Sequence, residues 1–373
     1  IGEGAVTLTA SATANTYIVT FNANTGSGTM ANQSFTYGIE QNLTANAFTK
    51  PGYTFVGWAT SANGSKVYND KQSVNNLTST ANGTVTLYAQ WTSSPNTTYK
   101  VEHYQEGLDG TYSVYETENL TGETDTTATA VYKTYAGFSS NTAHASTVTS
   151  GNINGNGSLV LKLYYSRNSY ALTLSAGTGV SSVTGAGTYK YGASVAIDAT
   201  VSEGYTWSIW VKTTGTTPSA FVATTKTQTI VMGAGAVTLT AMVDANTYTV
   251  TYNSNYGTAT TSTQEVTYNT SFTTKANTTF TRTGYTFSGW STSTSSLAGS
   301  YQSASTSYTY STAGDTTLYA IWTANTYTVT FNANGGTGTM ANQSFTYGIE
   351  QNLTANAFTK PGYTFVGWAT SAN

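Results

Sequence analysis

The sequence contains no cysteine, only two histidines and few charged residues. Without cysteine there is no disulfide, no thiolate zinc site and no iron–sulfur cluster. Charged residues make up 8% of the 373 positions and the formal net charge is −3, so no basic face is expected for a nucleic-acid backbone. Long apolar runs are also missing, and we therefore expect no bilayer-spanning segment and no membrane contact.

The sequence is rich in hydroxyl and aromatic side chains instead of charged ones. The chain holds 80 threonines and 39 serines, and 13% of its residues are aromatic. Threonine, tyrosine and valine favour strands, and a hydrophobic content of 38% supplies enough apolar surface for folding. The composition therefore predicts an ordered, mainly β protein.

Related segments recur along the sequence. Residues 14–63 and 324–373 are identical at 47 of 50 positions. A Gly-Tyr-Thr-Phe-x-Gly-Trp segment occupies 52–58, 284–290 and 362–368, with a weaker copy at 204–210, and closing segments lie at 85–91 and 317–322. Such periodic markers indicate tandem domains.

Alternating side chains predict half-buried strands. Tyr17, Val19 and Phe21 share one face of the first such segment, and Asn-Gly turn signals at 63–64 and 82–83 lie between strands. No long stretch has the 3.6-residue period of a helix. At most one short helix per domain is expected, with 40–48 and 70–80 as candidate segments.

These markers resemble the internalin-type B repeat, also called the Listeria–Bacteroides repeat. Residues 169–242 are similar to its divergent form, although Ile209 replaces the usual glycine and the closing tryptophan is absent. Residues 96–167 resemble the mucin-binding-protein-like repeat through Tyr99-Lys-Val-Glu-His-Tyr104 and Tyr135-Ala-Gly-Phe138. The resemblance implies a β-rich α+β fold of tandem small β-grasp (ubiquitin-like) domains in an elongated rod.

In these terms the sequence divides into six parts. They are the last strand of a truncated divergent B-repeat (1–13), a B-repeat (14–92), a mucin-binding-protein-like repeat (96–167), a divergent B-repeat (169–242), a B-repeat (246–323) and a truncated B-repeat (326–373). The sequence is thus expected to be an excerpt from a longer array. Two completions of 326–373 are open: a closing strand further along the chain, or a donor strand such as 6–10 of another chain.

The recurring aromatic and leucine positions are expected to form the small cores rather than sugar-stacking sites. The predicted core signature comprises Tyr17, Tyr53, Phe55, Trp58, Leu87, Trp91, Tyr205, Trp207, Trp210, Tyr248, Tyr285, Phe287, Trp290, Leu318, Trp322, Tyr327, Tyr363, Phe365 and Trp368.

Acid–base residues are concentrated in 96–167, which holds His103, His144 and seven carboxylates. They could form a Ca²⁺ or catalytic cluster, but the alternation of Glu116 and Glu118 is more typical of solvent-facing strand positions. We therefore expect no catalytic, cofactor-binding or metal-binding residues, no cofactor and no enzyme activity.

The sequence and the resemblance together favour a structural repeat region of a long extracellular bacterial surface protein, acting as a stalk or fibre. The expected partners are neighbouring repeats or further copies of the chain. The alternative is an adhesive module that binds mucin or another host or environmental glycan, and an enzyme is the third hypothesis. An exposed aromatic cluster on 96–167 would support the glycan hypothesis, whereas a pocket joining a histidine to two carboxylates would support an enzyme.

Overall fold

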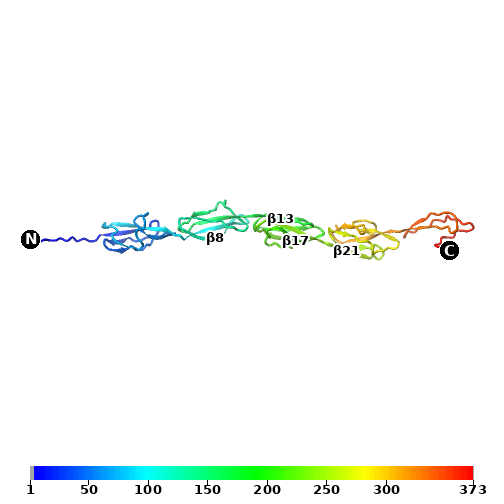
Figure 1. Ribbon diagram of the computed structural model, residues 1–373, viewed down its shortest axis with the longest axis horizontal. Helices are drawn as coiled ribbons and strands as arrows, with labels where there is room; N and C mark the ends of the chain where they lie inside the picture. The colour runs from blue at the N-terminus through cyan, green and yellow to red at the C-terminus, as the bar shows by residue number, and fades with distance from the viewer. Residues whose placement is uncertain (1–3, 373) are drawn as a thin grey trace. The chain divides into compact units, whose positions relative to one another are not determined.

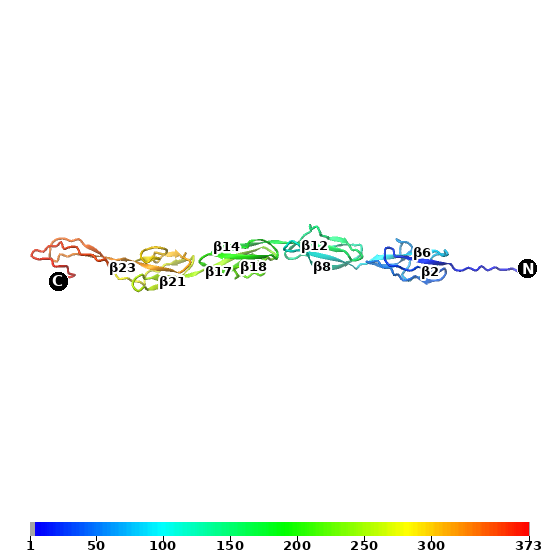
Figure 2. The same cartoon turned by 180° about the vertical axis from the view of Figure 1, so that it is seen from behind.

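The computed structural model describes residues 4–372, and every regular element in this range is a β-strand (Figure 1). The chain forms two compact units. One runs as far as Tyr170 and also contains Thr188–Ala193 and Val231–Gly235, and the other comprises Ala171–Gly187, Ser194–Ile230 and the residues from Ala236 on. The colours in Figures 1 and 2 change from sheet to sheet along the chain, so each main sheet is built from residues close in sequence.

The first repeat is a four-stranded mixed sheet with two short strands beside it. Its strands are β1 (Thr16–Asn22), β2 (Gln33–Thr36), β3 (Gln41–Asn42), β4 (Tyr53–Ala59), β5 (Ser73–Val74) and β6 (Thr84–Ser93). The sheet order is β2-β1-β6-β4. The last strand, β6, lies parallel to the first strand, β1, and antiparallel to β4. The closing segment is therefore inserted into the middle of the sheet.

A β-bulge sets the spacing of the aromatic residues in β4. The register against β6 shifts between Phe55 and Gly57. This extra residue changes the phase of the strand, so that Phe55 and Trp58, three positions apart, both pack into the core with ring centroids 5.0 Å apart. Gly57 has a φ of +141°, and a Cβ there would lie 2.4 Å from the Tyr68 carbonyl oxygen. The Phe-x-Gly-Trp spacing thus follows from the bulge.

The second repeat, in the same compact unit, has a sheet of similar order. Its strands are β7 (Thr97–Glu106), β8 (Tyr112–Gly122), β9 (Thr127–Thr129), β10 (Phe138–Ser140), β11 (Ser150–Asn152) and β12 (Val160–Arg167). The order is β10-β12-β7-β8, with β12 parallel to β7, and β9 pairs with β11 separately. First and last strands again lie side by side.

The third repeat contains β13 (Ser169–Ala176), β14 (Val180–Thr184), β15 (Gly187–Lys190), β16 (Ser194–Val201), β17 (Tyr205–Gly215), β18 (Gln228–Val231) and β19 (Val237–Ala245). In the second compact unit, β19 lies between the parallel strand β13 and the antiparallel strand β17, and β14, β16 and β18 form a second sheet. A register shift between Trp207 and Ile209 shows that the bulge forms even where isoleucine replaces glycine.

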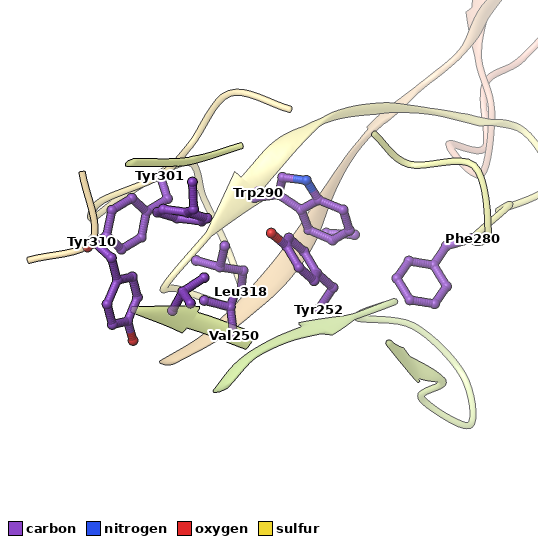
Figure 3. Packing of buried hydrophobic residues seen from close by; sticks show 10 residues of the cluster. Val250, Tyr252, Phe280, Trp290, Tyr301, Tyr310 and Leu318 are labelled. Carbon is purple, nitrogen blue, oxygen red and sulfur yellow. The ribbon is translucent and has the colours of Figure 1, made fainter. Parts of the chain in front are cut away.

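The fourth repeat has the order β21-β20-β25-β23. Its strands are β20 (Thr247–Asn253), β21 (Thr261–Thr267), β22 (Ser271–Thr273), β23 (Tyr285–Ser291), β24 (Ser307–Thr309) and β25 (Thr316–Ala324). Its core contains many aromatic side chains, and Figure 3 shows Trp290 beside Tyr252, with Val250 and Leu318 to the left of Tyr252. The remaining strands, β26 (Thr326–Val329) and β27 (Gln343–Thr346), form an antiparallel hairpin.

The two segments considered as helices are not helical. Residues 40–48 contain β3, which pairs with β5 of the 70–80 segment. Lys71 and Asn76 have φ values of +55° and +56°, which no right-handed helix accommodates. Among residues 4–372 no helix forms, and none therefore has the length and apolar character that a bilayer crossing requires.

The strand predicted over 1–13 is wrong for residues 4–13, and residues 1–3 lie outside the described residues. Residues 4–15 form no regular element, and Val6 and Leu8 are 83% and 90% exposed. A strand needs a neighbour for its N–H and C=O groups. None of the strand pairs within residues 4–372 involves this segment.

Candidate functional site

The second repeat buries a histidine within a polar network. His103, on the central strand β7, is fully buried. Its Nδ1 lies 2.8 Å from the Tyr165 hydroxyl, and its Nε2 lies 2.9 Å from a Glu118 carboxylate oxygen. The Tyr165 oxygen accepts the Lys133 N–H at 2.9 Å, which leaves its own hydrogen for Nδ1. In this arrangement Nε2 carries a hydrogen and donates it to Glu118.

Lys133 joins two carboxylates of the edge strand β8. Its Nζ lies 2.6 Å from Glu116 and 2.7 Å from Glu118, and the Tyr135 hydroxyl donates to Glu116 at 2.6 Å. The hydrogen bonds from Lys133 lower the pKa of both carboxyls, and those carboxylates in turn raise the pKa of Lys133. Burial, with the Glu116 hydrogen bond, raises the pKa of Tyr135. The cluster is therefore a set of mutually satisfied charges.

This network has the residue types of an acid–base dyad, and its histidine is engaged on both sides. Both ring nitrogens of His103 are hydrogen-bonded inside the repeat. Among residues 4–372, no group of three or more His, Cys, Asp or Glu side chains is placed to hold a metal ion. The other histidine, His144, stacks on Tyr164 at 3.7 Å between ring centroids. A structural role accounts for each of these contacts.

Acid should destabilise the second repeat. Because the folded-state pKa values of Glu116 and Glu118 are lowered from 4.5, their stabilising effect is complete above that value and is lost as pH falls through the lowered ones. Amide exchange of β7, measured between about pH 5 and pH 3, should show this loss. Lys133→Met removes the cation, so the stability of the second repeat in this variant should vary less with pH than in the parent protein. An equal dependence in both proteins would contradict the prediction.

The signature residues differ in exposure. Fully buried are Tyr17, Trp58, Leu87, Trp210, Trp290 and Leu318. Partly buried are Tyr53, Phe55, Trp91, Tyr205, Trp207, Tyr248, Tyr285, Phe287, Trp322 and Trp368. The indole N–H groups of Trp91 and Trp322 donate to the carbonyls of Ala23 and Ser254, respectively, at the end of the opening strand. The closing tryptophans thereby fix the central strand pair.

Three signature residues of the last repeat are not core residues. Tyr327, Tyr363 and Phe365 are 51%, 73% and 49% exposed. Tyr363 and Phe365 border a groove of 1210 Å³ that is also lined by Phe331 and Trp368. Within the described residues 326–372 no strand takes the place that β6 takes in the first repeat. The core prediction is wrong at these three positions because no strand within the described residues 326–372 covers them.

Consecutive repeats are joined by a recurring backbone contact. A junction is defined here by a linker residue, a glycine of the preceding repeat and a turn residue of the following repeat. At each junction the linker N–H donates to the glycine carbonyl, and the linker carbonyl accepts the turn N–H, all at 2.8–3.0 Å. The four sets are Gly52/Ser94/Thr124, Gly137/Asn168/Tyr191, Gly204/Asn246/Tyr268 and Gly284/Asn325/Tyr347. Each linker residue is therefore bonded to both of its neighbouring repeats.

Side chains reinforce the three junctions that have an asparagine linker. The asparagine Oδ1 accepts a hydroxyl hydrogen from the residue two positions after the glycine: Ser139, Thr206 or Thr286. The aromatic residue directly after the glycine meets the turn tyrosine edge to face. The pairs are Phe138–Tyr191, Tyr205–Tyr268 and Tyr285–Tyr347, with centroids 5.9, 5.3 and 5.6 Å apart.

Charges add to the junction at Asn168. Arg167 donates from its guanidinium to the Tyr191 carbonyl at 2.8 Å, and Lys190 lies 2.8 Å from Glu106. Burial tends to raise the pKa of Glu106, but the hydrogen bonds from Lys190 and Arg167 prevail and lower it. Glu106 is therefore a carboxylate that holds groups from two repeats.

The junction at Ser94 uses different side chains. Thr124 takes the place of tyrosine, and its hydroxyl donates to the Gly52 carbonyl at 2.7 Å. The Tyr53 hydroxyl donates to Asp125, and the Ser93 hydroxyl donates to Glu123. The same backbone contact is therefore built with two kinds of side chain.

The aromatic markers and strand patterns do not identify the junction residues. One signal was available: a tyrosine followed by glycine or asparagine recurs 22 or 23 positions after the asparagines at 15, 168, 246 and 325. In the first repeat, too, Tyr37 donates its N–H to the Asn15 carbonyl. Periodicity alone could not show that this turn contacts another repeat.

Comparison with known proteins agrees with the repeated sheets. The sequence matches the Listeria-Bacteroides repeat domain at 17–90, 248–321 and 327–373, more than half of its length. It also matches the divergent InlB B-repeat domain at 170–247. The chain therefore belongs to the Listeria-Bacteroides repeat family, as the sequence analysis predicted from the aromatic markers. The similarity of 96–167 to a mucin-binding-protein-like repeat stays a prediction.

One relative is a protein of Evansella cellulosilytica named as a Gly-rich membrane protein. It is 37% identical over 94 residues, which are 24% of this chain and 11% of that protein. The chain thus spans only a small part of the relative's length.

Proposed function

We propose that this chain is a structural repeat region of a long extracellular bacterial surface protein, acting as a stalk or fibre that spaces an adhesive or assembly end from the cell. The observation that carries the proposal is the repeated junction, in which one linker residue is bonded to the repeats on both sides. A linker held in this way restricts bending more than a free Gly/Ser tether does. Family membership supports a repeat region of a surface protein.

A tandem β-grasp arrangement is part of this proposal. Its support is the mixed sheet with the first and last strands parallel at its centre, seen in orders β2-β1-β6-β4 and β21-β20-β25-β23. The part of the chain from 4 to 372 has no helix across this sheet. Short strand pairs such as β3–β5 and β22–β24 contribute residues to the core instead.

The surface location is tested on intact cells of the source bacterium. Antibodies against the repeat 14–92 should label cells without permeabilisation, and external protease should remove the signal. Deletion of residues 169–323 should keep the protein on the surface but reduce the adhesion or assembly that depends on its outer end. Labelling only after permeabilisation would contradict the proposal.

The second candidate is a glycan- or mucin-binding module. One observation favours it: Tyr115 on the edge strand β8 is 62% exposed and lies edge to face with Tyr135 at 5.2 Å. Exposed tyrosines of this kind can stack on sugars. Mucin binding by the whole chain that is lost in Tyr115→Ala would favour this candidate over a purely structural one.

A further inference from the structure

We infer that Gly137, Gly204 and Gly284 are receptors for the turn tyrosine of the following repeat, and that this glycine–tyrosine lock fixes one repeat against the next. The inference deepens the proposed spacer function and rests on it. It is carried by close approach and hydrogen bonding at Gly137, Gly204 and Gly284.

The receptor glycines have no room for a side chain. A Cβ built on Gly137 or Gly284 would lie 2.3 Å from the ring of Tyr191 or Tyr347, and one on Gly204 would lie 2.5 Å from the ring of Tyr268. Real Cβ atoms do not approach ring carbons so closely. The tyrosine therefore occupies the space that any other residue would fill with its own side chain.

Backbone conformation alone does not account for the need for glycine at these three positions. Their φ values lie between +74° and +83°, which favours glycine in any case. Gly362 has the same φ, +77°, in the same Gly-Tyr-Thr-Phe segment, yet no atom lies within 4 Å of a Cβ built on it. Gly362 therefore distinguishes the effect of a positive φ from the effect of a contacting ring, because it has the same φ but no ring beside it.

The partner that fits this receptor is a specific kind of turn. Each docked tyrosine is followed by a residue in the left-handed region: Gly192 (φ +78°), Asn269 (φ +55°) or Gly348 (φ +78°). This turn directs the tyrosine N–H to the linker carbonyl while its ring covers the glycine. A repeat with threonine at this position, as at Thr124, brings Gly155 rather than a ring against Gly52. A repeat whose junction turn carries tyrosine therefore contacts the preceding glycine differently from a repeat whose turn carries threonine.

The test measures amide hydrogen exchange in the full chain. Gly284→Ala should accelerate exchange of the Asn325 and Tyr347 amides by about tenfold, because both donate across the junction. The matched control is Gly362→Ala, which carries the same conformational strain without a clash and should leave these two amides unchanged. Amides of β20 and β25 report whether the fourth repeat itself stays folded.

A double variant makes the assignment specific. In a Tyr347→Ala background the added Gly284→Ala change should accelerate exchange much less than it does in the parent chain, because the ring it would strike is gone and only the conformational strain remains. If Gly284→Ala unfolds the fourth repeat, Tyr347→Ala alone decides: it should accelerate Asn325 exchange, whereas Tyr37→Ala, in an identical local sequence, should not. Unchanged exchange of Asn325 in Tyr347→Ala, or equal effects of Gly284→Ala and Gly362→Ala, would overturn the lock. Neither result would bear on the surface location, which cell labelling tests separately.

Discussion

Replacement of Trp290 by alanine should lower the unfolding free energy of the fourth repeat by about 3–5 kcal/mol. The indole is 1% exposed and contacts the rings of Tyr252 and Phe280 at centroid distances of 4.7 and 6.1 Å (Figure 3). It also contacts the ring of Phe287 at 4.9 Å. Its Nε1 also donates to the Lys275 carbonyl at 2.8 Å. A loss of this size is comparable to the whole stability of a small domain, so the repeat should unfold.

Amide exchange resolved along the chain measures this loss and localises it to β20–β25. The first repeat offers a graded comparison, because Trp58 is equally buried but its Nε1 has no hydrogen-bond partner among the described residues. Trp290→Phe removes a hydrogen bond as well as volume, whereas Trp58→Phe removes volume only. Trp290→Phe should therefore be the more damaging of the two. A loss below about 1 kcal/mol in Trp290→Ala would contradict this account of the core.

A fragment of residues 326–373 should show no cooperative folding, whereas a fragment of residues 14–92 should fold. Residues 16–63 of the second fragment have nearly the same sequence as the first fragment, but there β6 supplies Leu87 and Ala89, both fully buried, between β1 and β4. Burial of one leucine side chain is worth roughly 1.5–3 kcal/mol. In 326–372 the corresponding space is the groove beside Phe365 and Trp368.

Circular dichroism and thermal unfolding of the two fragments check this prediction. A third fragment, 14–83, is the matched control, since it has the composition of a B-repeat but ends before the closing strand. It should behave like 326–373. A cooperative transition in either fragment that lacks the closing strand would show that the sheet is stable without it.

Local patterns in the sequence predicted much of each repeat. The alternation from Tyr17 to Phe21 is seen as buried Tyr17 and Val19 with Ile18 40% exposed. The β-rich fold and the B-repeat markers are confirmed by the strands and by the family match. These features depend on residues within one strand or one turn, which periodicity and turn propensity describe well.

The strand order could not be predicted in the same way. β1 and β6 pair in parallel across more than 60 positions of sequence, and nothing in either strand specifies which of its neighbours it meets. The bulge at Gly57 also changes the alternation, so that a strict two-residue period would place Phe55 and Trp58 on opposite faces. The burial of Tyr327, Tyr363 and Phe365 was predicted wrongly for a related reason. These aromatic residues are exposed, because their burial depends on a strand distant in sequence.

The contacts at the junctions could not be predicted from the sequence of a single repeat. Gly204 and Gly284 carry the signature of ordinary turn glycines, and only the position of the next repeat gives them a second role. His103 presents a similar limit. Its residue type suggested chemistry, but its burial and its two satisfied nitrogens arise from the pairing of β7 with β8 and β12.

The parallel pairing of first and last strands has a mechanical consequence for a single repeat. Because β1 and β6 run in the same direction side by side, the chain enters a repeat at one end of the central strand pair and leaves at the other. Tension applied to the two ends of the repeat would shear the strands along each other, loading all the hydrogen bonds between Ile18–Asn22 and Thr84–Tyr88 together. An antiparallel terminal pair would instead open one bond at a time. Such a repeat should therefore unfold slowly under force, and its lifetime under load is set by the unfolding rate rather than by equilibrium stability.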